Sequence, residues 1–252
     1  MKKIYEKNEL TFALMWIGIY CVVQSLCNSL NEVIGVGYSA SAVCCIAQAA
    51  VLLAFIRKNG LQQRMGLCAP AAPARRLLYY APLLIVMTRN LWDGAFATRP
   101  WEEVVCHIAC MLGVGFVEEI IFRGFLFRAM EKSNRRAAII VSSITFGLGH
   151  LVNLVNGSGA GLAENLYQVV GAMALGFMFV VLLDRGGSLL PCIAAHIVIN
   201  VTSGFASEAG TAPALRLAFN IALIVISVSY ALYLLKAIPA KEQAPGLEKA
   251  AQ

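Results

Sequence analysis

The sequence predicts an all-α, polytopic membrane protein of about eight transmembrane helices, with a polar site buried between the helices. Of its 252 residues, 59% are hydrophobic and only 13% are charged, whereas an average soluble domain contains about 25% charged residues. The apolar residues come in stretches of about 20, the length of a helix that crosses the hydrocarbon core of a bilayer. This composition excludes a disordered chain, a coiled coil and a disulfide-rich secreted domain.

Eight apolar stretches predict the membrane spans. In chain order they are roughly residues 11–30, 37–56, 77–93, 104–130, 137–155, 165–183, 187–204 and 213–235. The first stretch is too long for a signal peptide and is followed by no small-residue cleavage site, so we expect it to remain as a membrane helix. The spans predict a single transmembrane domain over residues 1–236. The polar residues 237–252 predict a disordered cytoplasmic tail.

The distribution of basic residues predicts that both termini lie in the cytoplasm. The net charge is +6 at pH 7, but the basic side chains form short clusters between apolar stretches, as the positive-inside rule describes. With a cytoplasmic N-terminus and eight spans, 16 of the 20 Lys and Arg residues fall inside, the exceptions being Arg89, Arg99, Arg123 and Arg216. We therefore expect a multi-pass protein of the cell membrane, in contact with the lipid bilayer and not with nucleic acid. Its oligomeric state stays open.

The eight cysteines indicate neither a disulfide framework nor a zinc site. All but Cys68 lie in apolar stretches, where cysteine behaves as a small hydrophobe. No C-x-x-C pair occurs. Cys106 and Cys110 lie one helical turn apart with His107 between them, a pattern that favours helix packing over metal binding.

Polar side chains are concentrated in three of the predicted spans. Residues 104–130 contain Glu118, Glu119 and Arg123, residues 137–155 contain His150, and residues 187–204 contain His196 and Asn200. A charged side chain near the centre of a bilayer costs about 2.5–3.5 kcal/mol on insertion scales, and it is tolerated where it faces other polar groups or a water-filled cavity. These residues are therefore the candidate functional site.

Their depth in the membrane supports one common site. Counted from the cytoplasmic end of each span at 1.5 Å per residue, Glu118 lies about 18 Å deep and His150 about 20 Å deep. His196 and Asn200 lie about 14 and 20 Å deep. Three helices that run in different directions therefore carry their polar residues to one level, whereas His107 has no such company and indicates a structural role.

Helix geometry separates the two glutamates. Glu119 and Arg123 are four residues apart on one helix face, which predicts an ion pair that is structural and orienting. Glu118 is turned by about 100° from Glu119. We therefore expect Glu118 to be the carboxylate that meets the histidines.

The residue types predict the outline of a peptide or ester hydrolase. Glu118 is a candidate general base that activates a water molecule. His150 and His196, together with Glu118, are candidate ligands of a divalent metal such as zinc, or else hydrogen-bond the water directly, so a metal-free site is the alternative. Asn200, with Arg123 if it reaches, is suited to stabilise a developing oxyanion. Neither an H-E-x-x-H motif nor a G-x-S-x-G elbow occurs.

The three polar segments resemble the motifs of a known family. EEIIFR at 118–123, FGLGH at 146–150 and HIVIN at 196–200 are similar to the E-E-x-x-x-R, F-x-x-x-H and H-x-x-x-N motifs of the CAAX prenyl endopeptidase and bacteriocin-processing (Abi) family. The core that bears these motifs covers roughly residues 101–204. The resemblance implies an intramembrane endopeptidase of about eight helices whose site opens toward the cytosol.

The resemblance also implies a role for each residue. Glu118 is the glutamate that activates water, and His150 and His196 position this water or bind a metal. Asn200 and Arg123 are ligands of the oxyanion or the substrate carbonyl, and Glu119 supports them. Whether a metal is required stays open. A hydrophobic or membrane-associated peptide is the expected substrate, and prenylation of this substrate is not implied.

Two other functions remain as alternatives. The chain could instead be a non-catalytic immunity or scaffold protein that binds a bacteriocin or another membrane partner, and such a function would survive the substitution Glu118→Gln. A transporter or proton relay would use the same buried Glu and His residues, but the internal repeats typical of transporters are not evident.

Overall fold

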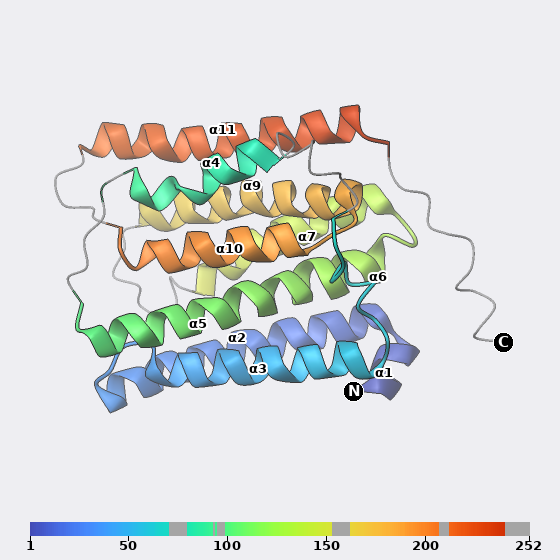
Figure 1. Ribbon diagram of the computed structural model, residues 1–252, viewed down its shortest axis with the longest axis horizontal. Helices are drawn as coiled ribbons and strands as arrows, with labels where there is room; N and C mark the ends of the chain where they lie inside the picture. The colour runs from blue at the N-terminus through green and yellow to red at the C-terminus, as the bar shows by residue number, and fades with distance from the viewer. Residues whose placement is uncertain (71–79, 93, 95–98, 153–161, 207–211, 240–252) are drawn as a thin grey trace.

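The computed structural model confirms the predicted all-α class. It describes residues 1–70, 80–92, 94, 99–152, 162–206 and 212–239, and within these ranges every regular element is a helix (Figure 1). The long helices run side by side along the longest axis of the molecule, as in a helical bundle (Figure 1). Most of the predicted tail, residues 240–252, lies outside the described residues.

The elements follow the predicted stretches in order. They are α1 (Lys2–Lys7), α2 (Glu9–Ile34), α3 (Ser39–Lys58), α4 (Ala81–Met87), the short η2 (Arg89–Leu91), α5 (Trp101–Glu119), η3 (Ile120–Phe127), α6 (Arg128–Met130), α7 (Arg135–Gly149), α9 (Leu162–Gly186), α10 (Leu190–Ser203) and α11 (Pro213–Ala237).

Five of the described helical segments are long and apolar enough to cross a membrane. They are Glu9–Ile34, Ser39–Lys58, Trp101–Met130, Glu164–Gly186 and Pro213–Ala237. The helices in the other three predicted spans are shorter than the roughly 20 residues of a full crossing, with 7 residues in α4, 15 in α7 and 14 in α10. Thus the structure supports a multi-pass membrane protein but does not confirm eight crossings.

The outer helices expose apolar side chains. Leu14, Val22 and Leu26 on α2 and Val225 and Leu232 on α11 are all more than half exposed. Only 28% of the most apolar 18-residue window of each of these two helices is buried inside the protein. Contiguous exposed apolar faces of this kind are expected of helices that contact lipid tails.

At one end of the bundle, ion pairs connect several of the segments that carry basic residues. Glu9, at the start of α2, pairs with Arg64, and its carboxylate lies 3.2 Å from Lys132 Nζ. Asp184, near the end of α9, pairs with Arg135 at 2.9 Å and with Arg185 at 3.1 Å. The structure therefore places these segments together, as the positive-inside pattern requires. That this end faces the cytoplasm stays a prediction.

The helix that carries both glutamates changes its winding directly after them. The predicted span over residues 104–130 is present as the continuous helical segment Trp101–Met130, in which Ile120–Phe127 form a π-helix that the sequence did not predict. A π-helical turn shifts the backbone hydrogen bonds to i→i+5 and occurs frequently at functional sites. From α7, the buried Ser142 donates a hydrogen bond from Oγ to the carbonyl oxygen of Phe122 at 2.9 Å.

Gly113 allows close packing of α5 against α3, and Gly113→Ala is expected to destabilise the fold. An added Cβ would lie 2.6 Å from Cys45 Cβ and 2.8 Å from the Cys45 carbonyl carbon. The two backbones would have to separate, so we expect a loss of about 1–3 kcal/mol in the free energy of unfolding, measured by SDS titration in mixed micelles. Gly18→Ala is the matched control, because nothing lies within 4 Å of its added Cβ. Equal stability of the two variants would contradict the packing argument.

Candidate active site

Glu119 and Arg123 form a fully buried ion pair. Arg123 Nη1 lies 3.0 Å from Glu119 Oε1, and neither side chain is exposed. The prediction that these two residues pair on one helix face is confirmed, although the backbone between them is π-helical. The Arg123 guanidinium also stacks on an aromatic ring, with its Cζ 4.0 Å from the centroid of Phe146. Arg123 is therefore held on two sides by side chains of the protein.

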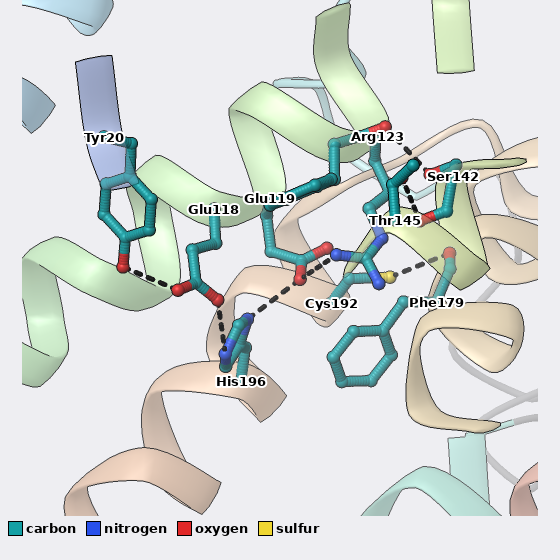
Figure 2. Close-up of polar contacts among 10 residues, drawn as sticks. Tyr20, Glu118, Glu119, Arg123, Ser142, Thr145, Phe179, Cys192 and His196 are labelled. Carbon is teal, nitrogen blue, oxygen red and sulfur yellow. Dashed lines mark hydrogen bonds and ion pairs between the residues drawn. The ribbon is translucent and has the colours of Figure 1, made fainter. Parts of the chain in front are cut away.

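His196 joins both glutamates. Its Nδ1 lies 2.9 Å from Glu119 Oε1, and its Nε2 lies 3.5 Å from Glu118 Oε2 (Figure 2). Glu118 was expected to be the carboxylate that meets the histidines, and it does face His196, but Glu119 contacts the same ring at a shorter distance. The reason is geometric, because an imidazole ring lies between the two side chains and presents one nitrogen to each.

A close approach of two helices makes these contacts possible. A Cβ added at Gly115 on α5 would lie 3.0 Å from the backbone nitrogen of Ile197 on α10 and 3.2 Å from its Cα. Since glycine has no Cβ, the backbones of α5 and α10 approach closely where Gly115 meets Ile197, one residue along from His196 on α10. Glu118 and Glu119 on one helix thereby reach His196 on the other.

Tyr20 is a site residue that sequence reasoning missed. Its hydroxyl donates a hydrogen bond to Glu118 Oε1 at 2.6 Å (Figure 2). The residue lies on α2, far along the chain from the three motifs. The available signal was an aromatic face with a spacing of four residues, since Phe12, Trp16 and Tyr20 are all buried on one side of α2. A tyrosine on such a face needs a partner for its hydroxyl.

His150 lies beside the cluster, at the end of α7. It is the C-terminal capping residue of this helix. Its ring lies 5.6 Å from that of Phe146, one turn earlier, which in turn lies 5.6 Å from His196. Phe146 therefore separates and orients two histidines of different helices.

A cavity of about 880 Å³ borders the histidines. Its described lining includes His150, His196 and Asn200, with the apolar side chains of Phe179, Leu175 and Ile199 beside them and Arg89, Glu164 and Arg216 farther away. Glu118, Glu119 and Arg123 are not among the described lining residues. Thus His150, His196 and Asn200 line one cavity, as the sequence predicts, and His196 connects this cavity to the buried carboxylates.

The lining residues show toward which end of the bundle the cavity extends. It reaches Glu164 near the start of α9, whereas Asp184, with its basic partners, lies 20 residues later on the same helix. At 1.5 Å per residue these positions are about 30 Å apart. The cavity therefore extends toward the end of the bundle opposite to the one where the basic segments lie, and the opening toward the cytosol that the resemblance implies stays a prediction.

The arrangement of the side chains does not favour the predicted metal site. Both nitrogens of His196 already face carboxylate oxygens, and Glu118 is held by Tyr20 and His196. In the part of the chain that the structure describes, no group of three or more His, Cys, Asp or Glu side chains is arranged to hold a metal ion. A metal bound by His150, His196 and Glu118 thus remains a prediction, and no chemical step is derived through it below.

The remaining candidates have structural contacts. His107 Nε2 lies 3.1 Å from the carbonyl oxygen of Val201, and its ring contacts Tyr38 edge-on. Cys110 packs against Cys45, with a distance of 3.8 Å between the two sulfurs. These contacts agree with the packing roles that the sequence indicates for His107 and Cys110.

The fold indicates an all-helical, multi-pass membrane protein, and its interior holds a cluster of glutamate, arginine and histidine side chains. Residues 100–202 match the family model described as Rce1-like, type II CAAX prenyl endopeptidase. Over residues 100–202, this match supports the family that the three motifs indicate, which is a family of proteases. No curated protein and no solved structure matches the chain.

Proposed function

We propose that the chain is an intramembrane endopeptidase that hydrolyses peptide bonds of a hydrophobic or membrane-associated peptide with a water molecule activated by Glu118. One observation carries this proposal. Glu118 is held between the Tyr20 hydroxyl and His196, while His196 borders the same cavity as His150 and Asn200. A fixed carboxylate next to an imidazole that reaches a cavity is suited to general acid–base catalysis.

The two nitrogens of His196 have different tasks in this proposal. Glu119 accepts a hydrogen bond from Arg123, and its Oε1 also faces Nδ1 of His196. An ionised, paired carboxylate at Nδ1 favours the tautomer that carries a proton there. Nε2 is then the nitrogen that exchanges a proton with Glu118 Oε2.

The reaction is a hydrolysis in which atoms and charge balance. Glu118 takes a proton from water while the water oxygen forms a bond to the carbonyl carbon of the substrate. His150 and Asn200, which line the cavity, donate hydrogen bonds to the oxygen that becomes negative. When the C–N bond breaks, Glu118 passes this proton from Oε2 to Nε2 of His196, which lines the cavity and gives up a proton to the amine product. The other product is a carboxylic acid.

Arg123 has a positioning role in the proposed mechanism. Its side chain is fully buried against Glu119 and Phe146, so we assign it to holding Glu119 rather than to the oxyanion.

The apolar lining of the cavity near the histidines, including Leu175, Phe179 and Ile199, suits apolar substrate side chains. The volume of the cavity falls in the usual range of ligand pockets, about 300–1,000 Å³. We further propose a location in the cell membrane with both termini in the cytoplasm.

A comparison of peptide termini by mass spectrometry tests this function. Membranes of cells that express the wild-type chain are compared with those of cells that express Glu118→Gln at equal abundance. We expect a defined set of new termini in the wild type that disappears in the variant, because glutamine cannot accept the proton from water. Glu102→Gln, an exposed change on the same helix, is the matched control and should retain all of these termini.

The same comparison separates the alternative function. If wild-type cells and Glu118→Gln cells contain the same termini while a phenotype of the wild-type chain persists in the variant, the endopeptidase proposal is wrong. A non-catalytic immunity or scaffold protein would then take its place.

A further inference from the structure

Tyr20 makes a short hydrogen bond to the proposed general base. The distance between the Tyr20 hydroxyl oxygen and Glu118 Oε1 is 2.6 Å, which falls in the range of about 2.5–2.7 Å for a hydroxyl that donates to a carboxylate. Tyr20 itself is only 8% exposed. A bond of this kind in apolar surroundings is stronger than the same bond in water.

The two carboxylate oxygens of Glu118 have different partners. Oε1 accepts the hydrogen bond from Tyr20, and Oε2 faces His196 Nε2 at 3.5 Å. A carboxylate held at one oxygen only would rotate about its last torsion angle, which is broad in glutamate. With Tyr20 on Oε1, the other oxygen, Oε2, lies toward the His196 ring (Figure 2).

The tyrosine comes from a part of the chain outside the family match. Helix α2 spans Glu9–Ile34, whereas the match covers residues 100–202. Its buried aromatic face, which includes Phe12 and Trp16, packs α2 into the protein and brings the Tyr20 hydroxyl to Glu118. The matched segment alone therefore leaves one oxygen of its glutamate without this donor.

We propose that Tyr20 is a positioning residue, which orients the Glu118 carboxylate so that Oε2 serves as the general base. This inference rests on the proposed endopeptidase function. Tyr20 does not exchange the proton itself. It holds the group that does, and α2 is thereby part of the active site rather than only a lipid-facing helix.

The kinetic test replaces Tyr20 with phenylalanine. This change keeps the ring and removes only the hydroxyl, so the packing of α2 is retained. With a peptide identified in the comparison of termini as the probe, we expect kcat to fall about tenfold, since a hydrogen bond to a charged group contributes at least this factor. KM is expected to stay within a factor of two, because Tyr20 is not among the described residues that line the cavity.

Tyr5→Phe is the matched control for the loss of a hydroxyl. Tyr5 is also buried, and its hydroxyl has no hydrogen-bond partner among the described residues. This variant should keep the wild-type kcat. A kcat of Tyr20→Phe equal to that of the wild type, or a change in KM alone, would overturn the proposal.

An infrared measurement tests the contact without any substrate. The difference between the spectra of the wild type and Glu118→Gln isolates the stretching band of the Glu118 carboxyl group. In a Tyr20→Phe background this band should move, because the hydrogen bond to Oε1 is lost, and in a Tyr5→Phe background it should not. An unmoved band in Tyr20→Phe overturns the inference even if activity falls. If the wild type yields no chain-dependent termini, the proposed function fails, while the band still reports whether Tyr20 holds Glu118.

Discussion

Replacing Arg123 with alanine is expected to lower the free energy of unfolding by roughly 3–5 kcal/mol, the cost of removing one partner from a buried ion pair. Neither Arg123 nor Glu119 is exposed, so water cannot replace the lost guanidinium. The stack of Arg123 on Phe146 is lost as well. The contact of Glu119 with His196 remains, which limits the loss. SDS titration in mixed micelles measures the change.

Three further variants separate charge from packing. Arg123→Lys keeps the charge but not the planar stack, so its loss should be smaller than that of Arg123→Ala. Lys2→Ala removes the partner of Glu6 in an exposed pair of α1, whose side chains are 68% and 59% exposed, and should cost at most about 1 kcal/mol. Glu119→Gln combined with Arg123→Ala should recover part of the loss, because the unpaired charge is gone. Full stability of Arg123→Ala would show that the pair is not needed for folding.

The convergence of the site could be predicted because bilayer thickness constrains depth. When three membrane helices carry polar side chains at one depth, these side chains find their hydrogen-bond and ion-pair partners mainly in one another. Accordingly, the Glu119–Arg123 pair and the meeting of Glu118 with His196 were both accessible from spacing and hydropathy. Depth does not determine which way a side chain turns. The contact of His196 with Glu119 therefore required the structure.

The parts that were missed depend on tertiary contacts. The contact between Tyr20 and Glu118 joins residues 98 positions apart in the chain, and no local pattern specifies such a pair. The π-helical segment Ile120–Phe127 differs from an α-helix by the placement of its hydrogen bonds, not by its hydrophobic pattern. In the third predicted span, residues 77–93, the part that the structure describes forms α4 over Ala81–Met87 and the short η2 over Arg89–Leu91 rather than one long helix.

Replacing His196 with alanine is expected to lower the rate at which chain-dependent termini form by about a thousandfold, within the range for loss of a general acid–base group. The imidazole is the side chain that contacts both carboxylates and also lines the cavity. Without it, Glu118 keeps only the Tyr20 hydroxyl among the partners described above. Glu119 keeps Arg123, so the protein should remain folded. Quantitative mass spectrometry of these termini, normalised to folded protein, gives the rate.

Rescue by added imidazole distinguishes catalysis from structure. Since His196 borders the cavity, a free imidazole can enter the space that alanine leaves and exchange a proton with Glu118. We expect it to restore part of the lost rate in His196→Ala and none in Glu118→Gln. His107→Gln serves as the histidine control. The described contacts of His107 are with the backbone of Val201 and Asn200 and with the ring of Tyr38, so the change leaves the side chains of the cluster in place and its rate should match the wild type. If the rate in His196→Ala falls only in proportion to the loss of folded protein, and imidazole restores nothing, His196 supports the fold and the proton path proposed through its ring does not operate.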